Sequence, residues 1–202
     1  MKIGITGGIG SGKSYVCRLL HQRGINVYDC DAAAKRLMHE SPTLRQQLTE
    51  LIGPDTYNAP SSSDDTAGHL NKAAVARFLL ASEENAKAVD AIVHPAVTAD
   101  FEQSGYDWIE SAILFEAGID HIVDRIIIVT APEEVRINRI MQRDGISEER
   151  ARQWLCRQWP QEEVLRRAHY EIINDGVTPL QPQTDNILRE LGLLTTVPDN
   201  QK

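Results

Sequence analysis

A short stretch near the start of the chain combines glycines, a lysine and a serine in a spacing that suits phosphate chemistry. Residues 7–14 read Gly-Gly-Ile-Gly-Ser-Gly-Lys-Ser and satisfy the Walker A pattern GxxxxGK[ST]. Glycines let the backbone curl until its N–H groups converge on phosphate oxygens. The ammonium of Lys13 can reach the terminal phosphates, and the hydroxyl of Ser14 is a ligand for Mg²⁺. The stretch therefore predicts a binding site for a nucleoside triphosphate with Mg²⁺.

The elements on either side of this loop are those that the chemistry requires. Lys2–Thr6 has the apolar pattern of a short buried strand, and Lys13–Arg23 carries one apolar face at helical spacing. The loop thus opens a helix, whose positive dipole end faces a bound anion. The loop residues expected to bind ATP are Gly8, Gly10, Ser11, Gly12, Lys13 and Ser14.

Two aspartates follow the second predicted strand, Ile25–Asp29. Asp29 and Asp31 would lie at its carboxyl end, where open parallel sheets bind their ligands. A carboxylate there can accept the proton of an attacking hydroxyl or help to hold Mg²⁺. Asp31 is the candidate base, although it would equally suit the N-cap of a helix that starts at Ala32.

Four arginines of a later helical region form the second candidate group. Arg139 and Arg143 lie one helical turn apart, and Arg150 and Arg157 share a face. Mobile arginines can neutralise the charge that phosphoryl transfer spreads over the equatorial oxygens. The alternative is a solvated face paired with nearby glutamates.

The other nucleotide-binding classes are less well matched. Residues 65–68 fit the GTPase pattern DxxG by letter but follow no strand, and residues 71–74 begin like NKxD but lack the aspartate. An ATPase motor usually has an apolar strand that ends in an acid, whereas residues 126–129 end in Thr130. The pattern favours a small-metabolite kinase.

Length and composition agree with one enzyme domain. The 202 residues suit an α/β domain with inserted subdomains. The net charge of −8 argues against a nucleic-acid partner, and no stretch resembles a signal peptide or membrane span. Three cysteines without CxxC spacing indicate reduced thiols, so we expect a cytoplasmic protein. The further predicted elements are strands at Tyr106–Ser111, Arg125–Thr130 and Glu171–Ile173, a polar loop at Pro60–Gly68, helices over 143–168 and Pro179–Leu191, and a C-terminal tail.

Six segments in order are similar to those of bacterial dephospho-CoA kinases, and the chain resembles that family over residues 3–190. The segments are Thr6–Ser14, Gly24–Asp31, His94–Pro95, Leu114–Glu116, Arg139–Asp144 and Ile172–Gly176. The chain departs from the family pattern at Tyr15, Lys35, Lys72 and Ala112–Ile113, none of which removes a group that the chemistry requires.

The resemblance implies ATP-dependent phosphorylation of the ribose 3′-hydroxyl of dephospho-CoA, the last step of coenzyme A synthesis. The alternative is another small-metabolite acceptor such as a nucleoside, a nucleotide or shikimate. The implied residues are Asp31, Lys13 and Arg143 for catalysis, Tyr15, Arg139 and Asn174 with the loop for ATP, Ser14 for Mg²⁺, and Asp31, Lys35 and His94 for the acceptor.

The resemblance also implies the architecture: an α/β P-loop kinase fold, with a five-stranded parallel sheet flanked by helices. The core would comprise about 1–31, 105–140 and 168–195, with a helical acceptor-binding insertion at about 32–104 and a helical lid at about 141–167. We expect a monomer or a weak homo-oligomer.

Overall fold

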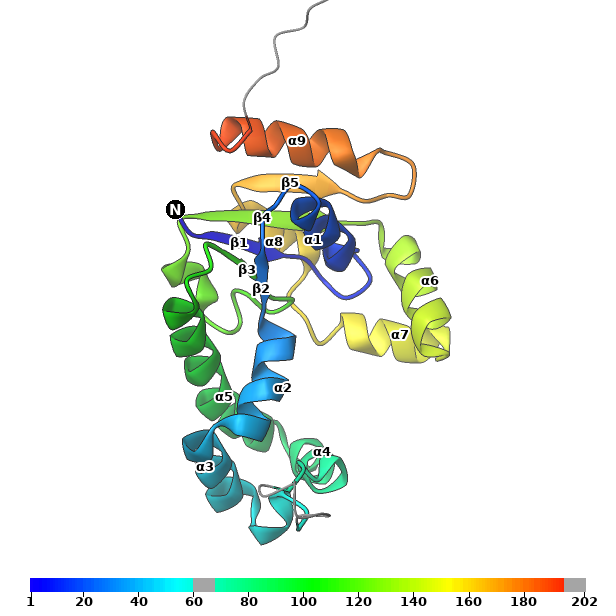
Figure 1. Ribbon diagram of the computed structural model, residues 1–202. Coiled ribbons are helices and arrows are strands. Elements are labelled where there is room, and N and C mark those ends of the chain that lie inside the picture. Colours follow the sequence, from blue (N-terminus) through cyan, green and yellow to red (C-terminus); the bar gives the residue numbers. More distant parts are fainter. Residues whose placement is uncertain (60–67, 195–202) are drawn as a thin grey trace, which may run out of the picture. The chain divides into compact units, whose positions relative to one another are not determined.

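The computed structural model describes residues 1–59 and 68–194 (Figure 1). The chain forms two compact units, one of residues 28–106 and one that joins residues 1–27 to the chain from Asp107 onward. Residues 60–67 of the polar loop predicted at Pro60–Gly68, and the tail from 195, lie outside the described residues. Within those residues, no helix is both long and apolar enough to cross a membrane.

A five-stranded sheet forms the centre of the fold, in the order β2-β3-β1-β4-β5. The strands are β1 (Ile3–Thr6), β2 (Val27–Asp29), β3 (Trp108–Glu110), β4 (Arg125–Thr130) and β5 (Tyr170–Ile173). β1 pairs in parallel with β3 and β4, and β4 pairs in parallel with β5. Every residue of β1 is buried, as is all of β4 after Arg125, which is typical of central parallel strands. The predicted α/β class with a five-stranded parallel sheet is confirmed.

The unit that joins residues 1–27 to the chain from Asp107 onward contains helices α1 (Lys13–His21), α6 (Glu133–Asp144), α7 (Glu148–Leu155), α8 (Gln161–Arg167) and α9 (Leu180–Glu190), with a 3₁₀ turn η2 (Ile119–Ile122). The helical stretch predicted over 143–168 is interrupted twice. Gly145 ends α6 in the left-handed conformation, with φ at +64°, which glycine adopts without strain. Pro160 then precedes α8, because a proline suits the start of a helix and not its interior.

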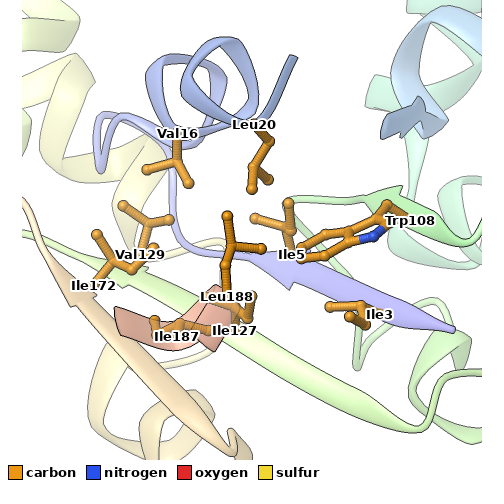
Figure 2. Close-up of a cluster of buried hydrophobic side chains, with 10 residues drawn as sticks. All are labelled: Ile3, Ile5, Val16, Leu20, Trp108, Ile127, Val129, Ile172, Ile187 and Leu188. Atoms are coloured by element: carbon orange, nitrogen blue, oxygen red, sulfur yellow. The ribbon is translucent and has the colours of Figure 1, made fainter. Parts of the chain in front are cut away.

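One face of the sheet is covered by α1 and α9. Figure 2 shows the buried cluster that lies between this face and the two helices. Val16 and Leu20 come from α1, and Ile187 and Leu188 from α9. The strand members are Ile3, Ile5, Trp108, Ile127, Val129 and Ile172. These alternate residues point to the same face because the side chains of a strand alternate between its two sides. This packing holds the start of α1, and so the loop before it, against β1.

The second unit is helical, as predicted. It contains α2 (Cys30–Glu40), α3 (Pro42–Ile52), a 3₁₀ turn η1 (Pro54–Thr56), α4 (Lys72–Ala81) and α5 (Glu83–Ser104). The hydroxyl or amide oxygens of Ser41, Asn71 and Ser82 cap α3, α4 and α5. The buried residues of α5 repeat every fourth position, at Val89, Val93, Val97 and Phe101. The boundaries predicted for the insertion and the lid stay predictions.

Ile127→Ala should lower the free energy of unfolding by about 2–5 kcal/mol, because it leaves a cavity in the centre of the sheet. Ile127 is 2% exposed in β4, whereas Ile173 in β5 is 43% exposed. Ile173→Ala is therefore the matched control and should cost much less. Urea unfolding measures both, and equal losses would contradict the placement of this core.

Candidate functional site

The predicted phosphate loop joins β1 to α1 and depends on glycine at two positions. Gly7 has φ at +145° and Gly12 has φ at +96°, a region that other residues rarely adopt. A Cβ on Gly7 would lie 2.3 Å from the carbonyl oxygen of Val129, and one on Gly12 would lie 2.1 Å from Nδ2 of Asn174. The positive φ favours glycine at both positions, and at position 7 the backbone of Val129 leaves no room for a side chain either.

Side chains from two other elements hold the carbonyl groups of this loop. Nδ2 of Asn174, the residue after β5, donates to the Ser11 carbonyl at 2.7 Å. Nη1 of Arg139, on α6, donates to the carbonyls of Gly10 and Ser11 at 3.3 Å each. Nη2 of Arg139 also donates to Oδ1 of Asn174 at 3.0 Å. The structure thus brings together the predicted loop, Arg139 and Asn174.

The amide groups of the loop are arranged for an anion. In the described part of the chain, the N–H groups of Gly10, Gly12 and Lys13 have no hydrogen-bond acceptor. Donors of this kind at the start of a helix, next to its positive dipole end, form a phosphate site. The loop can therefore do what its sequence predicts, which is to surround phosphate oxygens with backbone donors.

Lys13 lies beside an acid that the sequence analysis missed. Its Nζ is 3.5 Å from Oε1 of Glu110, and the two side chains are only 11% and 16% exposed. Glu110 ends β3 and is in register with Ile5 of the neighbouring β1. An acid next to the carboxyl end of the predicted strand Tyr106–Ser111 was a signal that could have identified it.

The remaining loop residues differ in what their side chains can do. The Ser11 hydroxyl is fully buried and has no hydrogen-bond partner among the described residues, so Ser11 offers only its backbone. Ser14, in the first turn of α1, is exposed and open to a metal ion. Tyr15 is 47% exposed, and its ring lies under the guanidinium of Arg18, 5.2 Å from the ring centroid. Gly8 contacts Arg136, which prediction also missed.

Arg143 lies apart from this arrangement, in the last turn of α6. Its side chain is 60% exposed, and its Nη2 is 2.7 Å from Oδ2 of Asp144. This hydrogen bond raises the pKa of Arg143 and lowers that of Asp144. Of the two predicted arginines of this helix, Arg139, expected to bind ATP, contacts the loop, and Arg143, expected to act in catalysis, faces solvent.

The acidic segment belongs to the unit of residues 28–106 and differs from expectation in one respect. The helix starts at Cys30 and not at Ala32, and its N-cap is Asp29, whose Oδ1 accepts from the Ala32 N–H at 2.9 Å. Asp31 is therefore not a cap. It is an exposed residue of the first turn, and its carboxylate has no partner among the described residues. The alternative prediction, that Asp31 is the N-cap of the helix, is wrong, since Asp29 is the N-cap.

The other two residues predicted for the acceptor, besides Asp31, lie in the same unit. Lys35 is exposed on α2, while its neighbour Arg36 pairs with Asp100 at 2.5 Å. His94 lies on α5 with its side chain 23% exposed and its Nε2 3.6 Å from Oδ1 of Asp90. Both side chains can therefore be reached by a ligand.

Comparison with known proteins supports one family. The family model of dephospho-CoA kinases matches residues 1–179. A curated dephospho-CoA kinase of Bacteroides fragilis is 40% identical over 194 residues, which cover 91% of this chain and 89% of that protein. The crystal structure of TT1252 from Thermus thermophilus has a TM-score of 0.75 and 32% identity, and the match covers 97% and 98% of the two chains.

A more distant structure supports the fold. The dephospho-CoA kinase from Campylobacter jejuni has a TM-score of 0.63 at 20% identity, with 95% of this chain and 98% of that chain covered. The phosphate loop, its supporting side chains and a match over nearly the whole chain lead to one conclusion: this chain belongs to the dephospho-CoA kinase family.

Proposed function

We propose that this protein transfers the γ-phosphoryl group of ATP to the ribose 3′-hydroxyl of dephospho-CoA, giving ADP and coenzyme A. The observation that carries the proposal is the family match over residues 1–179 in a chain whose phosphate loop is folded for nucleotide binding. That match favours dephospho-CoA over nucleoside, nucleotide or shikimate-like acceptors. It also supports a kinase over a nucleotide-operated switch.

The phosphate loop would bind the triphosphate through backbone amides and Lys13. Gly8, Gly10, Ser11 and Gly12 would supply backbone contacts, while Tyr15 would lie beside them on α1. Lys13 would move its ammonium from Glu110 to the terminal phosphates, because a triphosphate offers more negative charge than one carboxylate. Arg139 and Asn174 would support the loop and lie at the edge of the nucleotide site.

The residues near the loop fit a magnesium ion. In the described residues, no three His, Cys, Asp or Glu side chains cluster to form an all-protein metal site. Mg²⁺ usually takes one or two protein oxygens and otherwise substrate phosphates and water, so the exposed hydroxyl of Ser14 and the carboxylate of Glu110 suffice. When bound, the ion would supply charge that stabilises the transferring phosphoryl group.

Asp31 is the proposed base for the acceptor hydroxyl. Its carboxylate is exposed and has no competing structural partner among the described residues, so it is available to orient the hydroxyl and accept its proton. Lys35 and His94 would contact the acceptor, and Arg143 would neutralise the transferring group from the lid. A cytoplasmic location and a monomer or weak homo-oligomer stay predictions from the sequence.

Purified protein should release ADP with dephospho-CoA as acceptor and much more slowly with AMP, CMP or shikimate. A coupled ADP-release assay with equal acceptor concentrations measures this preference. Equal or faster turnover of any of the other acceptors would contradict the proposal that dephospho-CoA is the acceptor. Only the assignment to the kinase class would then remain.

Asp31→Asn should lower kcat by about 10²–10⁴-fold, because a general base typically contributes this much. ATP affinity should change little, and so should stability, since Asp29 caps the helix. Steady-state kinetics and thermal melting measure the two effects. Ser82→Ala is the control: it removes the cap of α5, so it should lower the melting temperature and leave kcat unchanged. Wild-type kcat in Asp31→Asn would reject the base.

Arg143→Ala should lower kcat by about 10³-fold or less. The loss in kcat should exceed the rise in KM for ATP. A lid arginine that contacts phosphate only on closure stabilises the transition state more than the ground state. Arg143→Lys should recover only part of the rate, because the planar fork is lost. Arg166→Ala, at another exposed arginine paired with an acid, should be neutral. An unchanged kcat in Arg143→Ala would move the lid role to Arg139, Arg150 or Arg157.

A further inference from the structure

Ile9 stands at the outer turn of the phosphate loop and is held in three ways. Its side chain packs on the hydrophobic cluster formed by Ile137 and Ile140 of α6 and Ala151 of α7. Its N–H donates to Oε1 of Gln158 at 2.7 Å. Its carbonyl accepts from Nε of Arg136 at 3.0 Å. Both backbone polar groups of Ile9 are thus engaged by side chains that lie far away in the sequence.

The position of Arg136 beside the Ile9 carbonyl costs free energy, because its charged side chain is buried. The residue is only 8% exposed, and no carboxylate in the described part of the chain lies within ion-pair distance of it. Burial lowers the pKa of its guanidinium, while the charge of Glu133 opposes this effect. A buried cation without a paired anion is unfavourable, so its position needs a compensating interaction at the loop.

The loop is shaped to receive this guanidinium. A Cβ on Gly8 would lie 2.1 Å from Nη2 of Arg136, and one on Gly10 would lie 2.7 Å from the Arg136 carbonyl oxygen. The absence of side chains at Gly8 and Gly10 therefore allows α6 and its arginine to approach the loop backbone. The glycines on both sides of Ile9 serve this contact as well as phosphate binding.

Gln158 links the loop to a third segment. While its Oε1 accepts from Ile9, its Nε2 donates to the carbonyl of Ala112 at 3.2 Å. The next residue, Trp159, donates its N–H to Oε1 of Glu116 at 3.2 Å and stacks on Phe115 with ring centroids 6.0 Å apart. The segment after α7 is therefore fixed between the phosphate loop and the chain that follows β3.

We propose that Arg136 and Gln158 are positioning residues, which hold the backbone carbonyl and N–H of Ile9 and so keep the phosphate loop in its ATP-binding shape. The inference rests on the proposed function only in taking ATP as the ligand of the loop. A glycine-rich loop has many accessible conformations, and ordering it before ATP arrives lowers the entropy lost on binding. The same contacts connect the loop to α6 and to the segment after α7. Movement of those elements would therefore change the position of the loop and its contacts with the phosphates.

The test compares Gln158→Met and Arg136→Met with two matched controls. Gln161→Met removes another glutamine whose Oε1 accepts from a backbone N–H, that of Ala131 at 3.1 Å, without touching the loop. Arg152→Gln removes another arginine of the α6–α7 pair, which binds Glu133, Glu134 and Glu148 on the surface. Calorimetric titration with a non-hydrolysable ATP analogue and Mg²⁺ measures Kd, and thermal melting reports stability.

Each test variant should raise the Kd of the analogue by about 3- to 10-fold, the range produced by losing one buried hydrogen bond. Both controls should keep the wild-type Kd, whatever their melting temperatures. Arg136→Lys should recover only part of the affinity, since it keeps the charge but loses the guanidinium geometry.

Three outcomes would overturn the inference. The first is an unchanged Kd in both test variants, and the second is an equal rise in the controls, which would show general loosening of α6 and α7. The third is complete recovery in Arg136→Lys, which would make charge alone sufficient. Binding of the analogue needs no acceptor, so an error in the acceptor would leave this test intact, whereas wild-type protein that binds no analogue would refute the proposed function itself.

Discussion

Parallel pairing of β1 between β3 and β4 is the constraint on which the candidate site depends. Because parallel strands end at the same edge of a sheet, the phosphate loop after β1 meets Glu110 at the end of β3 and Asn174 just beyond β5. Glu110 then pairs with Lys13, and Asn174 binds the Ser11 carbonyl. The buried cluster under α1 and α9 holds this edge in place, since it anchors both β1 and the helix that the loop opens. A site for a triphosphate thus follows from strand order as much as from the loop itself.

Local positive charge in an acidic protein is the second feature that the fold must supply. The chain carries a net charge of −8, yet Lys13, Arg136 and Arg139 all reach the phosphate loop. Each is held by a specific partner: a carboxylate for Lys13 and backbone carbonyls for the two arginines. The two arginines are thus fixed on the loop before a substrate arrives, and cations fixed in this way need little reorganisation when charge develops. The exposed Arg143 differs from them, because its guanidinium pairs with the carboxylate of Asp144 and not with a carbonyl of the loop.

In the helical unit, structural and chemical roles are divided between neighbouring acids. Asp29 caps α2, and Asp100 accepts hydrogen bonds from Tyr28 at 2.6 Å and Arg36 at 2.5 Å. Burial and the Asp100 hydrogen bond together raise the pKa of Tyr28. Asp31 takes no part in this network. A carboxylate that the fold does not use for stability is available for chemistry, and this division makes Asp31→Asn a sharp test.

The phosphate loop, the α/β class and the strongest strand could be predicted from the sequence, and this strand spans Arg125–Thr130 as expected. These features depend on local patterns: glycine spacing, a run of apolar residues and helical periodicity. Three sets of contacts could be seen only in the folded chain: Glu110 pairs with Lys13, Asp29 and not Asp31 caps α2, and Arg136 and Gln158 hold Ile9. The last two contacts join residues 127 and 149 positions apart. A single polar side chain has no periodic signal, so its partner is set by how the chain folds back on itself, and no local pattern could reveal it.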